Sequence, residues 1–409
     1  MVILDGGVAQ YPFAALAAAA LAALGISARS ADVNFTAQVT RPLKLAAAVP
    51  AIWIVVQILP IPFWSHSIWI NANEALNRQS WGHISIDIGK TCEALAFYLG
   101  NISLIVVGVF VARDRRRAEL ILMTLTTITT LTTIALLISK LIMGSATGEL
   151  NQMLSAVSSL GIILSLTSAV RVVEQYESRQ AAATSQNTRT SLVLCGAGLL
   201  VCIAGVAASA TLNVGLTVAF GALAFGSVQA IRRVGLASWA IAIFIATMII
   251  AAAMIILWRH DSSHMLSPFL QFATAASPEA ISITQRILSD TGWQGTGAAT
   301  YTQLLPIYQE FGSSVTKAPS TVSAFAIGLG WPMTLFIIAA AIELIVMLYR
   351  GALLRGRDSF YPAAATACTI IIFFQAFCDT SLLNPCVAMV GDAVIGLGLA
   401  QSVSNRESF

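Results

Sequence analysis

Long apolar runs recur along the chain, separated by mostly short polar intervals. Many are close to 20 residues long, the length that a helix needs to cross a hydrocarbon core of about 30 Å. Hydropathy predicts eleven such spans, at roughly 11–26, 45–62, 91–112, 119–143, 151–172, 191–210, 214–230, 237–258, 323–349, 361–377 and 386–402. The pattern therefore predicts an all-α, polytopic integral membrane protein with about 11 transmembrane helices.

Two polar intervals are too long to be turns. The first, 63–90, has tryptophans among polar residues, a composition typical of the boundary between lipid and water. The second, 259–322, carries apolar residues at helical spacing, so we expect it to fold into short helices. The predicted organisation is transmembrane helices 1–8 over 1–258, a large loop at 259–322, and helices 9–11 over 323–409.

Composition and charge exclude other classes and give an orientation. Of the 409 residues, 57% are hydrophobic and 10% are charged, which excludes a soluble globular domain and a disordered chain. Sixteen of the 22 Lys and Arg residues fall in one set of alternate intervals, and this side is predicted to be cytoplasmic. The N-terminus is then outside and the C-terminus cytoplasmic. Residues 1–10 resemble a loop between helices, so we expect a further helix upstream.

The first candidate for chemistry is Arg286, in QRILSDTGWQGTG within the large loop. A guanidinium presents a planar fork of donors that matches phosphate or carboxylate oxygens. The alternative is a surface ion pair with Asp290, four residues further along a helix. Gly295 and Gly297 indicate a tight backbone path, which turn geometry alone could also explain.

A second cluster, Arg259, His260, Asp261 and His264, lies where the span 237–258 ends. It could hold a phosphate and supply a general base, or simply anchor a helix end at the membrane interface. His260 and His264 are four residues apart but have no clear third ligand, so no metal site is predicted. The six cysteines also lack zinc-site spacing.

Other polar residues are candidates of lower specificity. Lys140 lies within a span, where it could be functional or could reach water from near the outer end. Glu343 has the same ambiguity in a later span. Asp392 lies nearer the middle of its span, where it could support close helix packing or pair with a cation on a neighbouring helix. His83, Asp87 and Glu93 lie at the outer entrance to the span 91–112. They could contact a polar substrate there, or they could form a rim that is exposed to solvent. No GxxxxGK[ST] motif occurs, which argues against ATP-driven transport by this chain alone.

The chain resembles the O-antigen ligase and polysaccharide polymerase family, most closely proteins of exopolysaccharide gene clusters. The residues that carry the resemblance are Arg286, Trp293, Gly295, Gly297, Tyr301 and Tyr308, followed by APSTVSAFAIGLGWPMTLFI. The segments LPIPFWSHSIWINANEAL and GHISIDIGKTCEALAFYL are similar to the outer loop before the third span in that family.

This resemblance implies a metal-independent glycosyltransferase in the bacterial inner membrane, with no cofactor and the large loop in the periplasm. Its partners would be an undecaprenyl-diphosphate-linked oligosaccharide, membrane lipid and other polysaccharide-assembly proteins, without nucleic acid. The resemblance, together with the clusters above, gives Arg286, Arg259 and His260 as catalytic candidates. The substrate-binding candidates are His264, Trp293, Gly295, Gly297, Tyr301, Asn213 and Lys140.

Two departures from the family are visible. Ligases commonly have a His-Asn pair just before the helix that follows the loop, and here that stretch is Ala318-Pro319-Ser320-Thr321. Asn213 stands where a second arginine often occurs in a short outer turn. Both departures favour a polymerase over a ligase. The alternatives are a transporter of polysaccharide or lipid-linked sugar and an inactive assembly subunit.

Overall fold

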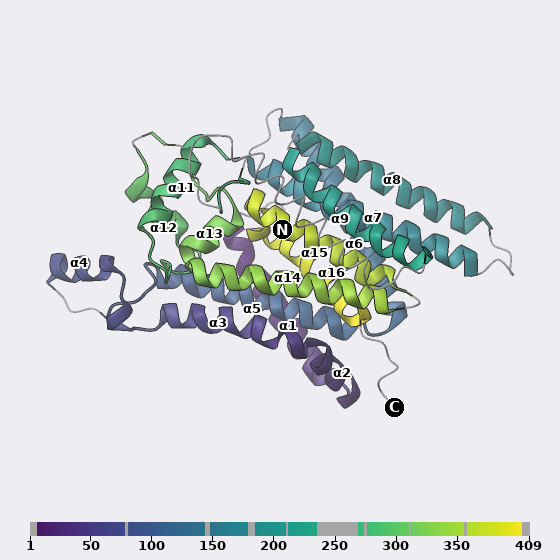
Figure 1. The fold of residues 1–409 in the computed structure, drawn as a ribbon, viewed down its shortest axis with the longest axis horizontal. Helices are drawn as coiled ribbons and strands as arrows, with labels where there is room; N and C mark the ends of the chain where they lie inside the picture. Colours follow the sequence, from purple (N-terminus) through teal and green to yellow (C-terminus); the bar gives the residue numbers. More distant parts are fainter. Residues whose placement is uncertain are drawn as a thin grey trace.

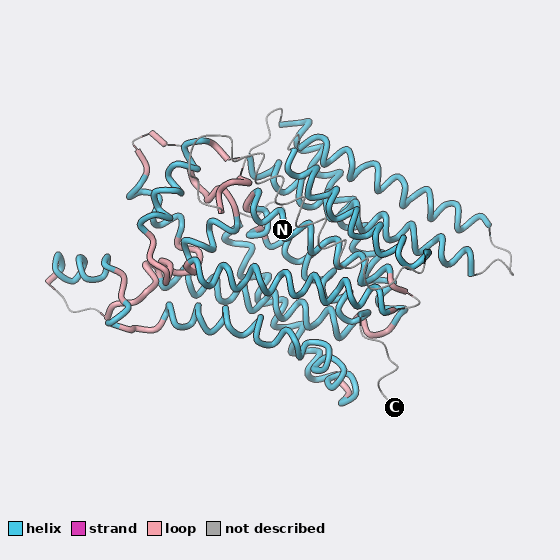
Figure 2. The backbone as a smooth tube through the Cα atoms, viewed as in Figure 1, coloured by secondary structure: helices cyan, strands magenta, loops and turns pink. Residues whose placement is uncertain are grey.

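The structure is a computed structural model that describes residues 6–77, 81–143, 148–178, 185–209, 212–234, 269–273, 276–310, 312–313, 315–355 and 358–402. These residues form helices joined by turns and loops, with no strand among them. Long apolar helices lie side by side along the longest axis of the molecule (Figures 1 and 2). The predicted class, an all-α polytopic membrane protein, is confirmed.

The long helices are α1 (Gly6–Ser27), α3 (Lys44–Ile58), α5 (Ile88–Val111), α6 (Arg115–Met143), α7 (Gly148–Ser178), α8 (Ser185–Ser209), α9 (Leu212–Val234), α14 (Trp331–Leu354), α15 (Phe360–Cys378) and α16 (Pro385–Ser402). The shorter helices are α2 (Ser30–Thr40), α4 (Ser67–Leu76), α11 (Pro278–Asp290), α12 (Tyr301–Tyr308) and α13 (Thr321–Gly328). Three 3-10 turns are η1 (Arg41–Leu43), η2 (Pro62–Trp64) and η3 (Ser381–Leu383).

Within the described residues, nine helices are long and apolar enough to cross a membrane, with α2, η1 and α3 counted as one continuous span. The apolar part of α1, Pro12–Ile26, is shorter. The predicted span 237–258 lies outside the described residues, so the count of eleven stays a prediction.

The helix boundaries differ from the sequence prediction in two places. Residues 30–40, expected in an inner loop, form α2, which buries Thr36 and Val39. The predicted span 323–349 is divided, because Gly330 has a φ of +86° and the helix restarts at Trp331 with a proline in its first turn. The first piece, α13, contacts the short helices α11 and α12 as well as α14 and α15.

Helix α7 is the most enclosed of the nine spans and lies against α6, α8, α9 and α15. Hydroxyl side chains occur along α6 and α7, and many donate to a carbonyl one turn back, as Thr129 and Thr167 do. Thr126 and Ser168 also form a hydrogen bond between the two helices, at 2.9 Å. Small residues whose polar atoms are satisfied in this way allow close helix packing without lipid-exposed polar groups.

The two long polar intervals come together at one end of the bundle, where α4, α11, α12 and α13 lie (Figure 1). We call this region the cap, and define it as the described residues of 59–87 and 276–330. The Ile86 amide donates to the Thr296 carbonyl at 2.9 Å, which joins the two segments directly. Both intervals were predicted to lie on the same side of the membrane, and their contact agrees with that prediction.

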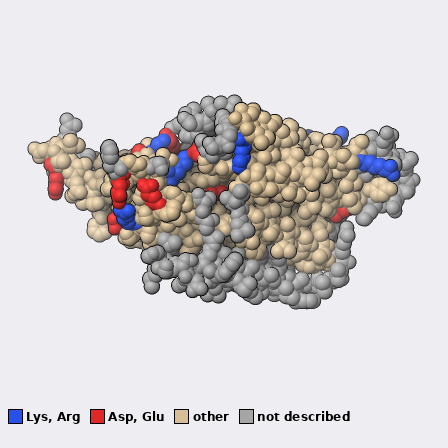
Figure 3. Space-filling view, turned by 90° about the horizontal axis from the view of Figure 1, so that it is seen from above, with Lys and Arg blue, Asp and Glu red and all other residues tan. Residues whose placement is uncertain are grey.

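Many arginines predicted to be cytoplasmic lie at the opposite end of the bundle. Three ion pairs connect helices there, namely Arg113–Asp32, Arg115–Asp358 and Arg171–Glu119. On the face seen in Figure 3 charged side chains lie over the left half of the view and near the right-hand end, and a wide stretch between these two groups is largely uncharged. This distribution fits a molecule whose middle section lies in hydrocarbon.

Candidate functional site

The cap is attached to the bundle through two side chains of α3. Gln57 is fully buried, and its amide nitrogen donates to the carbonyls of Gln294 at 3.0 Å and Gly328 at 2.9 Å. Its amide oxygen accepts from the Ala298 amide at 3.1 Å. The indole of Trp53 donates to the Leu329 carbonyl at 2.8 Å. The loop 291–300 is therefore held in place by a transmembrane helix.

Gly295 and Gly297 are required by the backbone of this loop. Their φ angles are +77° and +106°, a region that other residues rarely adopt. A Cβ at Gly295 would lie 2.4 Å from the Gly328 carbonyl oxygen, and one at Gly297 would lie 2.4 Å from the Ser85 hydroxyl. The structure thus gives both glycines a packing role, which accounts for them without a ligand.

Trp293 lies at the outer side of this loop in a cluster of three tryptophans. Its ring centroid is 6.1 Å from that of Trp53 and 6.0 Å from that of Trp64, the latter in an edge-on arrangement. Trp293 is 48% exposed, so part of its ring is available to a ligand. A half-exposed indole at this position suits an interfacial anchor and equally a surface for stacking a sugar ring.

Arg286 lies on the exposed side of α11. That helix buries Ala280, Ile283, Thr284 and Ile287 on its opposite side, starts at the N-cap Ser277 and ends at Asp290. The predicted surface pair with Asp290 is not the one formed, because Arg286 approaches Glu310 instead, at 3.9 Å. Asp290 accepts a 3.0 Å hydrogen bond from Tyr308, and burial together with this carboxylate raises the pKa of the Tyr308 hydroxyl.

Two predicted substrate-binding residues, Tyr301 and Asn213, have structural roles here. Tyr301 is 5% exposed, and its hydroxyl shares a 2.8 Å hydrogen bond with Thr284 inside the cap. Burial raises the pKa of that hydroxyl. Asn213 is buried and donates to the Phe272 carbonyl at 3.0 Å, which ties the start of α9 to the turn 269–273. In this conformation neither side chain presents its polar group to a substrate.

Lys140 connects three helices near the end of the bundle that carries the cap. Its ammonium donates to Asn151 at 2.8 Å and to the Ala208 carbonyl at 2.5 Å. These bonds join α6, α7 and α8, so the lysine has a packing role in this structure.

His83, Asp87 and Glu93, the residues predicted at the entrance to α5, also have partners close by in the structure. Asp87 is the N-cap of α5 and accepts from the Lys90 amide at 3.0 Å, while the Lys90 ammonium pairs with Glu93 at 2.7 Å. His83 bonds to the Ile58 carbonyl through Nδ1 at 2.7 Å. These contacts fix the entry to α5.

The stretch Ala318–Thr321, compared above with the His-Asn pair of ligases, leads into α13. Ser320 is fully buried, and its hydroxyl caps the helix in a reciprocal arrangement with Ser323. The Thr321 amide and hydroxyl both donate to the Asp379 carbonyl at 2.9 Å. No titratable side chain stands among Ala318, Pro319, Ser320 and Thr321.

Asp379 is a buried acid that sequence reasoning missed. It follows α15, is 3% exposed, and accepts from the Ser381 amide at 2.9 Å and hydroxyl at 2.6 Å. Burial raises the pKa of its carboxyl, and the bonds from Ser381 oppose that change. The only signal in the sequence is the Asp-Thr-Ser of a short turn, which is common in loops.

Arg259, His260 and His264 lie outside the described residues, so their predicted roles stay predictions. The described part of the chain contains no group of three or more His, Cys, Asp or Glu side chains that could hold a metal ion. The six cysteines all lie in described residues, and none of them is in a disulfide.

The chain matches none of the protein-family models and none of the curated proteins with which it was compared. Among the predicted site residues that the structure describes on the cap, Arg286 and Trp293 are the two whose side chains are exposed.

Proposed function

We propose that the protein is a membrane glycosyltransferase that polymerises or ligates undecaprenyl-diphosphate-linked oligosaccharides at the periplasmic face, during synthesis of a surface polysaccharide or exopolysaccharide. The observation that supports this most directly is the exposed guanidinium of Arg286 on the folded cap. The half-exposed Trp293 lies on the same cap. A cation and an aromatic surface match the two parts of the donor, a diphosphate and a glycan.

In the proposed reaction a hydroxyl oxygen of the acceptor attacks the anomeric carbon of the donor sugar. The bond from that carbon to the diphosphate oxygen breaks, and undecaprenyl diphosphate leaves with the electron pair. The hydroxyl proton passes to a nearby base or to water. Arg286 would stabilise the negative charge that develops on the leaving oxygen, through donors placed before the reaction.

The pair between Arg286 and Glu310 allows this role. The two side chains are 54% and 84% exposed and 3.9 Å apart, at the limit of an ion pair. Surface pairs of this kind contribute between 0 and about 1 kcal/mol, so a diphosphate can replace the glutamate as partner.

The test uses the full chain, purified and reconstituted with undecaprenyl-diphosphate oligosaccharide, with release of undecaprenyl diphosphate and growth of the glycan as readouts. Arg286→Ala should lower the rate about 100-fold or more, the usual loss when one charge-stabilising donor is removed. Arg286→Lys should also lose most of the rate, because an ammonium lacks the planar fork. Glu310→Gln, which leaves the arginine in place, is the matched control and should retain activity.

Equal rates for wild type, Arg286→Ala and Arg286→Lys would remove Arg286 from the site. An inactive wild-type protein would favour a transporter or an assembly subunit instead. The specific observation in favour of an assembly subunit is that Ala318–Thr321, the stretch compared above with the His-Asn pair of ligases, has no histidine and begins a helix with Ser320 as its buried cap.

A further inference from the structure

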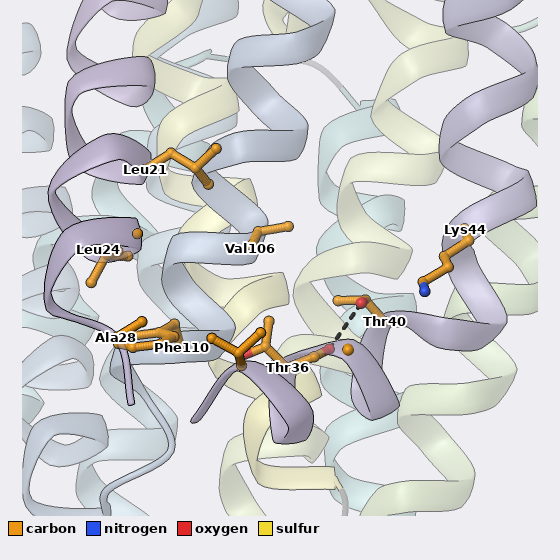
Figure 4. Close-up of a pocket in the computed structure, with 11 residues that line it drawn as sticks. Leu21, Leu24, Ala28, Thr36, Thr40, Lys44, Val106 and Phe110 are labelled. Carbon is orange, nitrogen blue, oxygen red and sulfur yellow. Dashed lines mark hydrogen bonds between the residues drawn. The ribbon is translucent and has the colours of Figure 1, made fainter. Parts of the chain in front are cut away.

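A groove lies between α1, α2 and α5, toward the end of the bundle opposite the cap (Figure 4). Its volume is about 320 Å³, and its walls include Leu21, Gly25, Val33, Val106 and Phe110. Leu21 and Val33 are 39% and 51% exposed, so the groove opens on the surface of the molecule. It is separate from the cap and from every residue of the proposed reaction.

The two threonines in the wall add methyl groups and no free hydroxyl. Thr36 donates to the Asp32 carbonyl at 2.9 Å, and Thr40 donates to the Thr36 carbonyl at 2.8 Å. Both hydroxyls are therefore satisfied within α2. A water molecule in this groove would find few partners, whereas a hydrocarbon chain would meet an apolar surface along its length.

The groove has a positive edge. Lys44, at the start of α3, is one of its lining residues, and Arg29 and Arg41 flank α2 on the same part of the chain. The acidic residue of α2, Asp32, is paired with Arg113, whose guanidinium also lies 5.3 Å from the Phe35 ring. Asp32 therefore serves to hold α2 against the end of α5, and it is not the partner of Lys44.

We propose that this groove binds one acyl chain of an anionic phospholipid, with the lipid phosphate at the ammonium of Lys44. An apolar channel open to the bilayer and ending at a cation matches an anionic lipid in both of its parts, the chain and the head group. The choice of an anionic over a zwitterionic lipid rests on the positive charge of Lys44, Arg29 and Arg41.

Two variants test the binding of the acyl chain and the binding of the head group separately. Gly25 lines the groove and a Cβ there would meet no atom within 4 Å, so Gly25→Leu introduces a bulky side chain into the groove from an open position. Gly196→Leu is the matched control, because Gly196 on α8 also has open space around its Cα. Lys44→Gln removes the charge, and Arg117→Gln removes an exposed cation of α6 that does not line the groove.

The measurement is native mass spectrometry of the full chain, released from nanodiscs of phosphatidylglycerol mixed with phosphatidylcholine. Wild type should retain phosphatidylglycerol preferentially. Lys44→Gln should lower that preference about fivefold, the ratio that corresponds to about 1 kcal/mol per basic residue near a membrane surface. Gly25→Leu should lower retention of both lipids, and the two control variants should behave as wild type.

Equal retention of the two lipids by wild type would overturn the proposal, and so would Gly25→Leu retaining as much lipid as Gly196→Leu. Loss of the preference on addition of 10 mM inorganic phosphate would also overturn it, because it would show a site for a free anion. If Gly25→Leu does not purify as a single species, the comparison of Lys44→Gln with Arg117→Gln decides the test.

Discussion

At the residue scale, the cap depends on backbone conformations that only a few side chains allow. Gly295 and Gly330 have positive φ angles, and a Cβ on either would lie within 2.5 Å of a backbone atom of the facing segment. Gly312 has a φ of +92° but open space around it, and Gly292 has neither restriction. These positions separate the effect of strain from the effect of crowding.

Alanine at these positions should therefore give a graded loss of stability. Gly292→Ala should be neutral, Gly312→Ala should cost about 1 kcal/mol for the left-handed backbone, and Gly295→Ala should cost about 3 kcal/mol or more. The measurement is the temperature at which half of the purified protein leaves the monodisperse peak in size-exclusion chromatography. Equal temperatures for Gly292→Ala and Gly295→Ala would contradict the close approach of residues 295 and 328.

At the element scale, α4 projects from the rest of the cap (Figure 1), and two side-chain hydrogen bonds fix its first turn. His66 is its N-cap, and the ring nitrogen Nδ1 accepts from the Ile68 amide at 3.2 Å. The Trp69 indole donates to the Ser85 carbonyl at 2.9 Å. Burial lowers the pKa of His66, and a protonated ring cannot accept the capping bond.

Acidification should therefore loosen α4. Because the pKa of His66 is lowered on folding, the detached form of the helix binds the proton more tightly. Stability is complete above the unfolded pKa of about 6.5 and is lost as the pH falls below it. Hydrogen exchange of residues 67–76, corrected for intrinsic rates, should show less protection at pH 5.5 than at pH 7.5.

In His66→Asn the cap residue does not titrate in this range, so the difference in protection between pH 5.5 and 7.5 should disappear. A wild-type difference that persists in this variant would assign the effect to another group.

At the scale of the whole molecule, the bundle has two chemically different ends. One carries the cap with α4 and α11–α13, and the other carries the ion pairs of Arg113, Arg115 and Arg171. The excess of basic residues in short intervals predicts that the second end is cytoplasmic. The proposed reaction requires the cap to face the periplasm.

Cysteine labelling tests this orientation. In a Cys92→Ser background, which removes an exposed thiol, Glu74→Cys on α4 should react with a membrane-impermeant maleimide while the inner membrane is intact. Arg116→Cys at the start of α6 should react only after that membrane is disrupted. The reverse pattern would place the cap in the cytoplasm and would rule out the proposed function while leaving the fold unchanged.

The structure also shows how two residues of the candidate site lie. Tyr301 and Asn213 were predicted to contact substrate, yet both are buried and bonded within the protein. Their residue types are right for a binding site, but type alone does not say which side of a helix faces solvent. Arg286 was predicted on the same grounds, and the burial of Ile283 and Ile287 on the other side of α11 leaves it exposed.

The sequence by itself determined the all-α, membrane-spanning class and the place of most of the long apolar helices, because the thickness of the bilayer imposes a length on apolar runs. Only the tertiary structure decided that Gln57 holds a loop more than 230 residues away, that Asp379 supports the start of α13, and that α1, α2 and α5 enclose a groove. The physical reason is that hydropathy is a property of each segment, whereas these contacts join segments distant in sequence and leave no local pattern.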